Sequence, residues 1–94
     1  MLTDSPAKID DMLAFKELNE TLKKKLEEFG KKLSGKEKYI FENRLMSDDP
    51  MTLQEIGDHF GITRERIRQI EKRLLEKLKK FLLREMPEYF SEEK

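Results

Sequence analysis

Cysteine and tryptophan are absent from this chain of 94 residues, which has only four glycines, three prolines and one histidine. Without cysteine, the chain can form neither a disulfide framework nor a cysteine-based zinc site. No apolar run approaches the roughly 20 residues that a membrane-spanning helix needs, and the N-terminus lacks a signal-peptide pattern. These absences favour a soluble intracellular protein, and the length favours one small domain.

Groups that could support catalysis are scarce as well. His59 is the single histidine, and it is expected to be a surface residue because it has no cysteine partners. Neither a Ser-His-Asp set nor a glycine-rich phosphate loop is present. We therefore expect no enzymatic activity, no catalytic residue, no metal site and no cofactor.

The chain has no useful length of alternating apolar and polar residues, which is the signature of a strand. Charged residues make up 43% of it, and the prominent Lys, Glu, Leu and Arg are good helix formers. The sequence therefore predicts an all-α fold with a domain of four helices. The expected boundaries are a flexible N-terminus at residues 1–6, the helical domain at residues 7–86 and a C-terminal tail at residues 87–94.

The first two helices are predicted from capping signals and apolar spacing. Ser5 and Pro6 suit the start of the first helix, and Gly30 is expected to stop it. Its apolar stripe consists of Phe15, Leu18, Leu22, Leu26 and Phe29. The second helix should begin at Ser34, which has capping-box spacing to Glu37.

Residues 52–72 have the pattern of a helix-turn-helix, two helices that cross at a steep angle over a short turn. Thr52 and Glu55 form a second capping-box pair, and Thr63 can cap the helix that follows. Gly57 lies where the helices would approach each other, and Gly61 can adopt a left-handed conformation in the turn. Apolar residues should clamp the corner from both sides: Ile56, Phe60, Ile62, Ile67 and Ile70. The motif would place a recognition helix at residues 64–84.

Basic residues are concentrated in this last helix although the whole chain is neutral. Residues 64–84 contain nine Lys or Arg and three Glu, a local balance of +6, so the remaining residues sum to −6. Such asymmetry suggests a polyanionic partner for one face. An ordinary solvated helix rich in Lys and Arg would look the same by charge alone.

One face of the last helix, opposite its apolar residues, presents Arg64, Glu65, Arg68 and Gln69. In the major groove, Arg can bridge two acceptors of guanine, Gln can pair with adenine and Glu can accept from cytosine. Glu65 is informative because a carboxylate weakens attraction to DNA. It suits a contact with a hydrogen-bond donor on a base, or an arginine-orienting role, while a plain helix charge pair is the alternative.

Other residues of the motif could contact phosphate rather than bases. The candidates are Thr52, Thr63, Arg66, Lys72 and Arg73. The two threonines also have a role as helix caps, which does not prevent the adjacent helix N-termini from approaching phosphate.

The stretch "TLQEIGDHFGITRERIRQIEKRLLEKLKKFL" closely resembles region 4 of bacterial sigma-70 family factors, and "LSGKEKYIFENRL" is similar to the first part of that region. The resemblance covers residues 33–82 well and residues 7–32 loosely. It implies a domain that recognises the −35 element of promoters, double-stranded DNA, while attached to core RNA polymerase and docked on the flap of its β subunit. An anti-sigma factor or an activator would be a further partner.

The resemblance also implies roles for particular residues. Base contacts would come from Arg64, Glu65, Arg68 and Gln69, and positions near the DNA backbone would belong to Thr52, Leu53, Thr63 and Arg73. An activator would face Arg73, Lys77 and Lys79, where Glu76 departs from the basic character expected. "ENRLMSDDPMTLQEIG" is more similar to heat-shock-type factors than to primary ones, whereas "TRERIRQIE" suits both.

Ninety-four residues cannot include the regions that bind the −10 element, so the chain is either an excised C-terminal domain or a stand-alone homologue. We expect a monomer in the bacterial cytoplasm, at the nucleoid. Two alternatives stay open. One is a self-standing helix-turn-helix regulator that dimerises through the stripe of its first helix. The other is a module that binds polymerase or an anti-sigma factor and has little affinity for DNA by itself.

Overall fold

The computed structural model of the chain describes residues 9–90, with side chains from residue 14 onward. The elements in chain order are the helices α1 (Ile9–Lys31) and α2 (Gly35–Ile40), the π-helix η1 (Phe41–Leu45), and the helices α3 (Leu53–Phe60) and α4 (Arg64–Glu85). These residues contain no strand, which confirms the all-α prediction. The predicted cap at Ser5 and Pro6, the flexible N-terminus and the last four residues of the tail lie outside the described residues.

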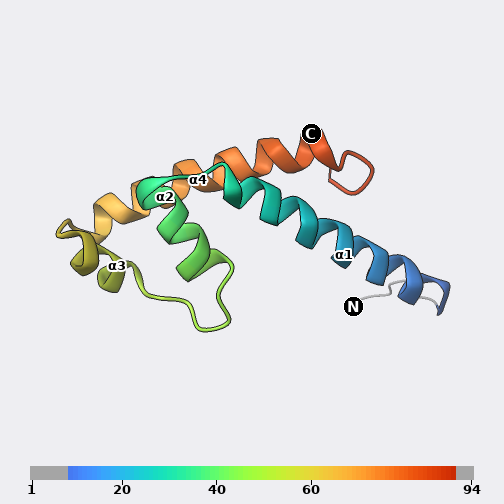
Figure 1. Cartoon of the computed structure of the whole chain (residues 1–94), viewed down its shortest axis with the longest axis horizontal. Helices are drawn as coiled ribbons and strands as arrows, with labels where there is room; N and C mark the ends of the chain where they lie inside the picture. The colour runs from blue at the N-terminus through green and yellow to red at the C-terminus, as the bar shows by residue number, and fades with distance from the viewer. Residues whose placement is uncertain (1–8, 91–94) are drawn as a thin grey trace.

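Helix α4 is the central helix of the domain, and the other helices pack against it (Figure 1). Helices α2 and α3 gather around its N-terminal half, while the C-terminal part of α1 contacts its C-terminal half and the rest of α1 diverges from it. The domain is consequently elongated, with extents of 49 × 27 × 27 Å. The core lies where all four helices converge and consists of Phe29, Ile40, Phe41, Ile56, Ile67, Ile70, Leu74 and Phe81.

Aromatic rings connect α1 to the rest of this core. The ring of Phe29 meets that of Phe41 edge-on at a centroid distance of 5.5 Å and lies 5.2 Å from that of Phe81. Burying each such side chain stabilises the fold by about 1.5–3 kcal/mol. A second link is ionic, because Lys25 Nζ lies 3.1 Å from Glu85 Oε1 at the far end of α4.

The predicted apolar stripe of α1 is only partly used. Phe29 is buried and Leu26 packs against the core, but Leu18 and Leu22 are half-buried and Phe15 is 62% exposed. The reason is geometric, since α1 diverges from α4 and its N-terminal half leaves the core behind (Figure 1). The side chains of residues 9–13 lie outside the described part of the chain.

Gly30 does not stop α1, so this prediction was wrong. The helix continues to Lys31, and Gly30 is buried inside it. A Cβ at this position would lie 2.8 Å from Cε2 of Phe41. Glycine at this position thus permits the close approach of α1 to a buried ring and does not form a left-handed turn.

The capping box predicted at Ser34 is also absent. Ser34 is the N-cap residue of α2, but its side chain makes no capping hydrogen bond. Gly35, with φ of +62°, gives the first turn an irregular backbone, and the carboxylate of Glu37 instead accepts a hydrogen bond of 2.9 Å from Lys77 of α4. Glu37 thus links α2 to α4 and does not cap the N-terminus of α2.

The second helix changes pitch midway, which the sequence did not indicate. From Phe41 onward the chain follows a π-helix, closed by a 2.9 Å hydrogen bond from Met46 N to the carbonyl of Phe41. A π-helix is rare and often lies at a functional position. Its residues include Arg44, which contacts α4.

Helix α4 ends at Glu85, just before Pro87, as predicted from that proline. Beyond it the chain turns back, and the amides of Tyr89 and Phe90 both donate to the carbonyl of Met86, which is buried. The predicted tail therefore begins with an ordered turn that packs beside α4.

Candidate DNA-binding surface

The corner between α3 and α4 has every local feature that the sequence predicted. Thr52 and Glu55 form a reciprocal capping box, with hydrogen bonds of 3.0 and 2.9 Å. At the other end of α3, Gly61 is left-handed with φ of +73°. Thr63 then caps α4 by accepting a 3.1 Å hydrogen bond from the amide of Arg66.

Gly57 of α3 packs closely against the backbone of the turn that leads into α4. A Cβ there would lie 2.6 Å from the carbonyl oxygen of Ile62, which is backbone that cannot easily move away. Ile56 and Ile67 are fully buried across the corner, and Ile70 is buried beside them. This packing fixes which side of α4 faces the core and which faces solvent.

The four residues predicted to contact bases are exposed together on the outer side of α4: Arg64, Glu65, Arg68 and Gln69. We call them the reading face. They occupy the N-terminal part of the second helix of the motif, the part that enters the major groove in helix-turn-helix proteins. Their contacts with bases remain a prediction.

Glu65 and Arg68 form a bidentate pair on this face. Arg68 Nη2 and Nε donate to the two carboxylate oxygens of Glu65 at 2.6 and 2.9 Å. The hydrogen bond from Arg68 lowers the pKa of Glu65, and the same contact raises the pKa of Arg68. The contact is an i, i+3 ion pair between two exposed side chains, which is the helix charge pair that the sequence offered as the alternative to an arginine-orienting role.

The residues predicted to contact the DNA backbone lie at the start of α3, at the start of α4 and further along α4. Thr52, Thr63, Arg66, Lys72 and Arg73 are exposed, and Leu53 is half-buried at the start of α3. The hydroxyls of both threonines are used as caps, so a phosphate would meet the free amides of the helix N-termini beside them. Arg66 also donates to Gln69 Oε1 at 3.3 Å.

The three residues predicted to face an activator, Arg73, Lys77 and Lys79, are all exposed along α4. Lys77 is not a simple solvated cation, because its ammonium is paired with Glu37 of α2. The positive charge predicted for this surface is therefore partly neutralised by a neighbouring helix.

Sequence reasoning missed an ion pair between Arg44 of η1 and Glu71 of α4. Arg44 Nε lies 2.7 Å from Glu71 Oε2, and Arg44 Nη1 donates to the carbonyl of Met51 at 2.9 Å. The partners are 27 residues apart, so no helical spacing rule could connect them. The spacing of apolar residues also did not predict the π-helix that contains Arg44.

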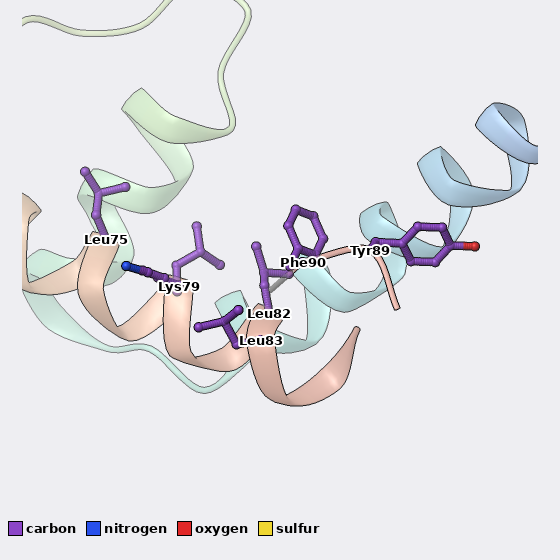
Figure 2. A pocket seen from close by; sticks show the side chains of 7 residues that line it. Leu75, Lys79, Leu82, Leu83, Tyr89 and Phe90 are labelled. Carbon is purple, nitrogen blue, oxygen red and sulfur yellow. The ribbon is translucent and has the colours of Figure 1, made fainter. Parts of the chain in front are cut away.

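Sequence reasoning also missed an apolar groove at the far end of α4 (Figure 2). Leu75, Leu82 and Leu83 of the helix lie along it, with Tyr89 and Phe90 from the C-terminal turn at one end. The groove has a volume of about 550 Å³, and Lys79 also lines it. Leu75 and Tyr89 are 44% and 48% exposed, so this apolar surface is open to solvent.

Other kinds of site find little support in residues 9–90. No cluster of His, Cys, Asp or Glu in this part could hold a metal ion. His59 is exposed, as predicted, and its ring stacks on that of Tyr39 at 4.4 Å. None of the helices described is long and apolar enough to cross a membrane.

Comparison with known proteins agrees with this arrangement. The chain is similar to the RNA polymerase sigma-B factor of Myxococcus xanthus (49% identical over 57 residues, 61% of this chain and 23% of that protein). It is also similar to the sigma-C factor of the same organism (48% over 58 residues, 62% and 20%) and to the sigma factor RpoH of Caulobacter vibrioides (47% over 55 residues, 58% and 19%). The chain thus spans about a fifth of the length of these relatives.

RpoH factors among the relatives agree with the heat-shock-like character predicted from residues 42–57. The family model of sigma-70 region 4 matches residues 31–80, which include α3, most of α4 and the whole reading face. That match covers more than half of the chain, and the chain therefore belongs to the sigma-70 region 4 family.

Proposed function

We propose that this chain recognises the −35 element of promoters for a heat-shock-like sigma factor and so directs core RNA polymerase to initiate transcription. The observation that carries the proposal is the reading face. Arg64, Glu65, Arg68 and Gln69 are exposed together on a helix whose opposite side is buried in the core. Membership of the region 4 family supports the same conclusion.

The role of Glu65 in this proposal is to hold Arg68 in a defined orientation before DNA binds. An arginine held by a bidentate contact loses less freedom on binding than one that moves freely in solvent. On DNA, the guanidinium of Arg68 would exchange onto guanine or keep its partner while Glu65 accepts from cytosine. Attraction to phosphate alone would gain nothing from this carboxylate.

Binding to DNA by the isolated chain should be weak. Most non-specific affinity comes from neutralised phosphates, and the chain as a whole has no net charge. Attachment to polymerase would supply the missing affinity by raising the effective concentration of the reading face at the promoter. The proposal therefore includes a monomeric chain that acts on core polymerase at the bacterial nucleoid.

Attachment needs a protein-binding surface away from the reading face. The groove of Leu75, Leu82, Leu83, Tyr89 and Phe90 is apolar and open, and it lies toward the opposite end of α4 (Figure 2). In the proposal the β flap of polymerase occupies it. An anti-sigma factor would compete for the same apolar surface, and an activator would face Arg73, Lys77 and Lys79.

The experiment is selection of bound DNA from a random pool, with the full chain tethered to the β flap of core polymerase. We expect enrichment of one short motif. The matched control is the same assembly carrying Arg68→Ala, which should lose preference at one position of the motif and keep the others. Recovery of unenriched DNA by the unaltered chain would refute promoter reading.

A further inference from the structure

Arg44 lies at the meeting point of three parts of the domain. It belongs to η1, its Nη1 bonds to the carbonyl of Met51 in the segment before α3, and its Nε bonds to Glu71 of α4. The side chain of Glu71 is only 13% exposed, whereas that of Arg44 is 30% exposed. The planar fork of arginine can bond two acceptors in fixed directions at once, which a lysine ammonium does less selectively.

Glu71 is also a neighbour of the reading face. It follows Arg68 by three residues on α4, a spacing at which side chains meet on a helix surface. Arg68 and Glu71 line the same shallow depression, together with Lys72, Leu75 and Glu76. The carboxylate of Glu71 therefore lies between the buried side of α4 and the edge of the surface proposed to contact DNA.

A carboxylate without a partner at this place would disturb recognition in two ways. It could take the guanidinium of Arg68 from Glu65 and so change the direction in which Arg68 points. It would also add a negative charge next to phosphate, which opposes binding. The contact with Arg44 holds Glu71 on the inner side of the helix and pairs its negative charge with a guanidinium there.

We propose that Arg44 is a positioning residue for DNA reading: by holding the carboxylate of Glu71, it leaves Arg68 paired with Glu65 and aimed at the base edges. Arg44 need not contact DNA for this role. The inference rests on the proposed function of the reading face and adds a residue outside the helix-turn-helix to it.

The π-helix explains how Arg44 reaches α4. Its hydrogen bonds span five residues, so successive side chains turn through a smaller angle than in an α-helix. The change of pitch at Phe41 thus alters the direction in which Arg44 leaves the backbone. At the same time, the 3.0 Å bond from Met51 N to the carbonyl of Asn43 brings the second acceptor of Arg44 close.

The test uses the full chain tethered to polymerase, with four versions compared in the DNA selection: unaltered, Arg44→Gln, Glu71→Gln and the double variant. Arg44→Gln should reduce preference at the position read by Arg68 by about fivefold or more, since a good base contact contributes about 1–3 kcal/mol. Glu71→Gln should keep that preference because no carboxylate is left to misplace. The double variant should recover it for the same reason.

Recovery by the second substitution separates positioning from other roles. If the double variant is as poor as Arg44→Gln, then Arg44 contacts DNA itself or only supports folding, and the inference is overturned. Equal loss at every position of the motif would overturn it as well. Melting temperatures of all versions are measured. If Arg44→Gln does not fold, Arg44→Lys is compared with the Arg44→Lys, Glu71→Gln double variant instead. Arg44→Lys should lose less of the preference at the position read by Arg68, and the double variant should again recover it.

Failure of the inference is distinguishable from failure of the proposed function. If the unaltered chain selects no motif, promoter reading itself is wrong. If the unaltered chain selects a motif and Arg44→Gln retains every preference within it, only the positioning role of Arg44 is wrong.

Discussion

Replacing Gly57 with alanine should destabilise the corner between α3 and α4. The added Cβ would lie 2.6 Å from the carbonyl oxygen of Ile62, 3.3 Å from the amide nitrogen of Arg64 and 3.3 Å from the carbonyl carbon of Thr63. All three atoms are backbone, and they form the turn that joins the helices. No side-chain rotation can relieve such a contact, so the helices must separate.

The magnitude follows from two opposing terms. Overpacking of a well-packed site costs about 1–3 kcal/mol, and backbone contacts place Gly57 at the upper end. Alanine is more favourable than glycine inside a helix by about 1 kcal/mol, which offsets part of this. A net loss of about 2 kcal/mol remains. In a domain of this size, each kcal/mol lowers the melting temperature by roughly 4–8 °C, so we expect a decrease on the order of 10 °C.

Thermal unfolding followed by circular dichroism measures this effect. Gly30→Ala is the matched control, because its Cβ would meet the ring of Phe41 at 2.8 Å, a side chain and not backbone. That ring can shift, so the control should lose less stability than Gly57→Ala. A Gly57→Ala variant that melts at or above the temperature of the unaltered chain would refute the close-approach argument.

The remaining predictions concern recognition and pH. Arg68→Ala and Glu65→Ala should each change preference at a single base position by about 1–3 kcal/mol, checked by binding to all variants of that position; equal loss on every sequence would contradict base reading. Lys72→Ala should weaken binding uniformly and reduce the salt slope by about one, measured by titration at several salt concentrations; an unchanged slope removes Lys72 from the DNA footprint. Hydrogen bonds from Arg68 and Lys25 hold the pKa values of Glu65 and Glu85 below their ordinary value of 4.5. The ionised carboxylates of Glu65 and Glu85 should therefore stabilise the fold above pH 4.5, and this stabilisation should be lost as the pH falls below that value. The melting temperature of a Glu65→Gln, Glu85→Gln double variant should consequently fall less on acidification than that of the unaltered chain.

Two roles of glycine in this domain show where sequence reasoning succeeds. At the corner, Gly57 and Gly61 were assigned correctly because a helix-turn-helix imposes its demands within about twenty residues. Capping by Thr52 and Thr63 was predicted correctly for the same reason, as each cap involves groups only three residues apart. Such local rules need no knowledge of the rest of the fold.

Predictions failed where a distant partner changed the local outcome. Gly30 was predicted to end α1 because glycine commonly ends helices, but the ring of Phe41 from η1 packs against it inside the helix. Glu37 had capping-box spacing, but Lys77 of α4 takes its carboxylate. Phe15 has the helical spacing of the other apolar residues of α1, which predicted that it would be buried. Its side chain is nevertheless exposed, because this part of α1 has diverged from α4. In each case the deciding contact lies outside the element concerned.

The sequence by itself determined that this protein is helical, where its corner lies and that the reading face lies on the exposed side of the last helix, because helical period and capping are local properties of the chain. Only the tertiary structure decided what surrounds that reading face. It joined Arg44 to Glu71 across 27 residues, and it brought Tyr89 and Phe90 back against the leucines of α4. Both arrangements bring together residues of different elements as the chain folds back on itself, and local sequence patterns do not predict such contacts.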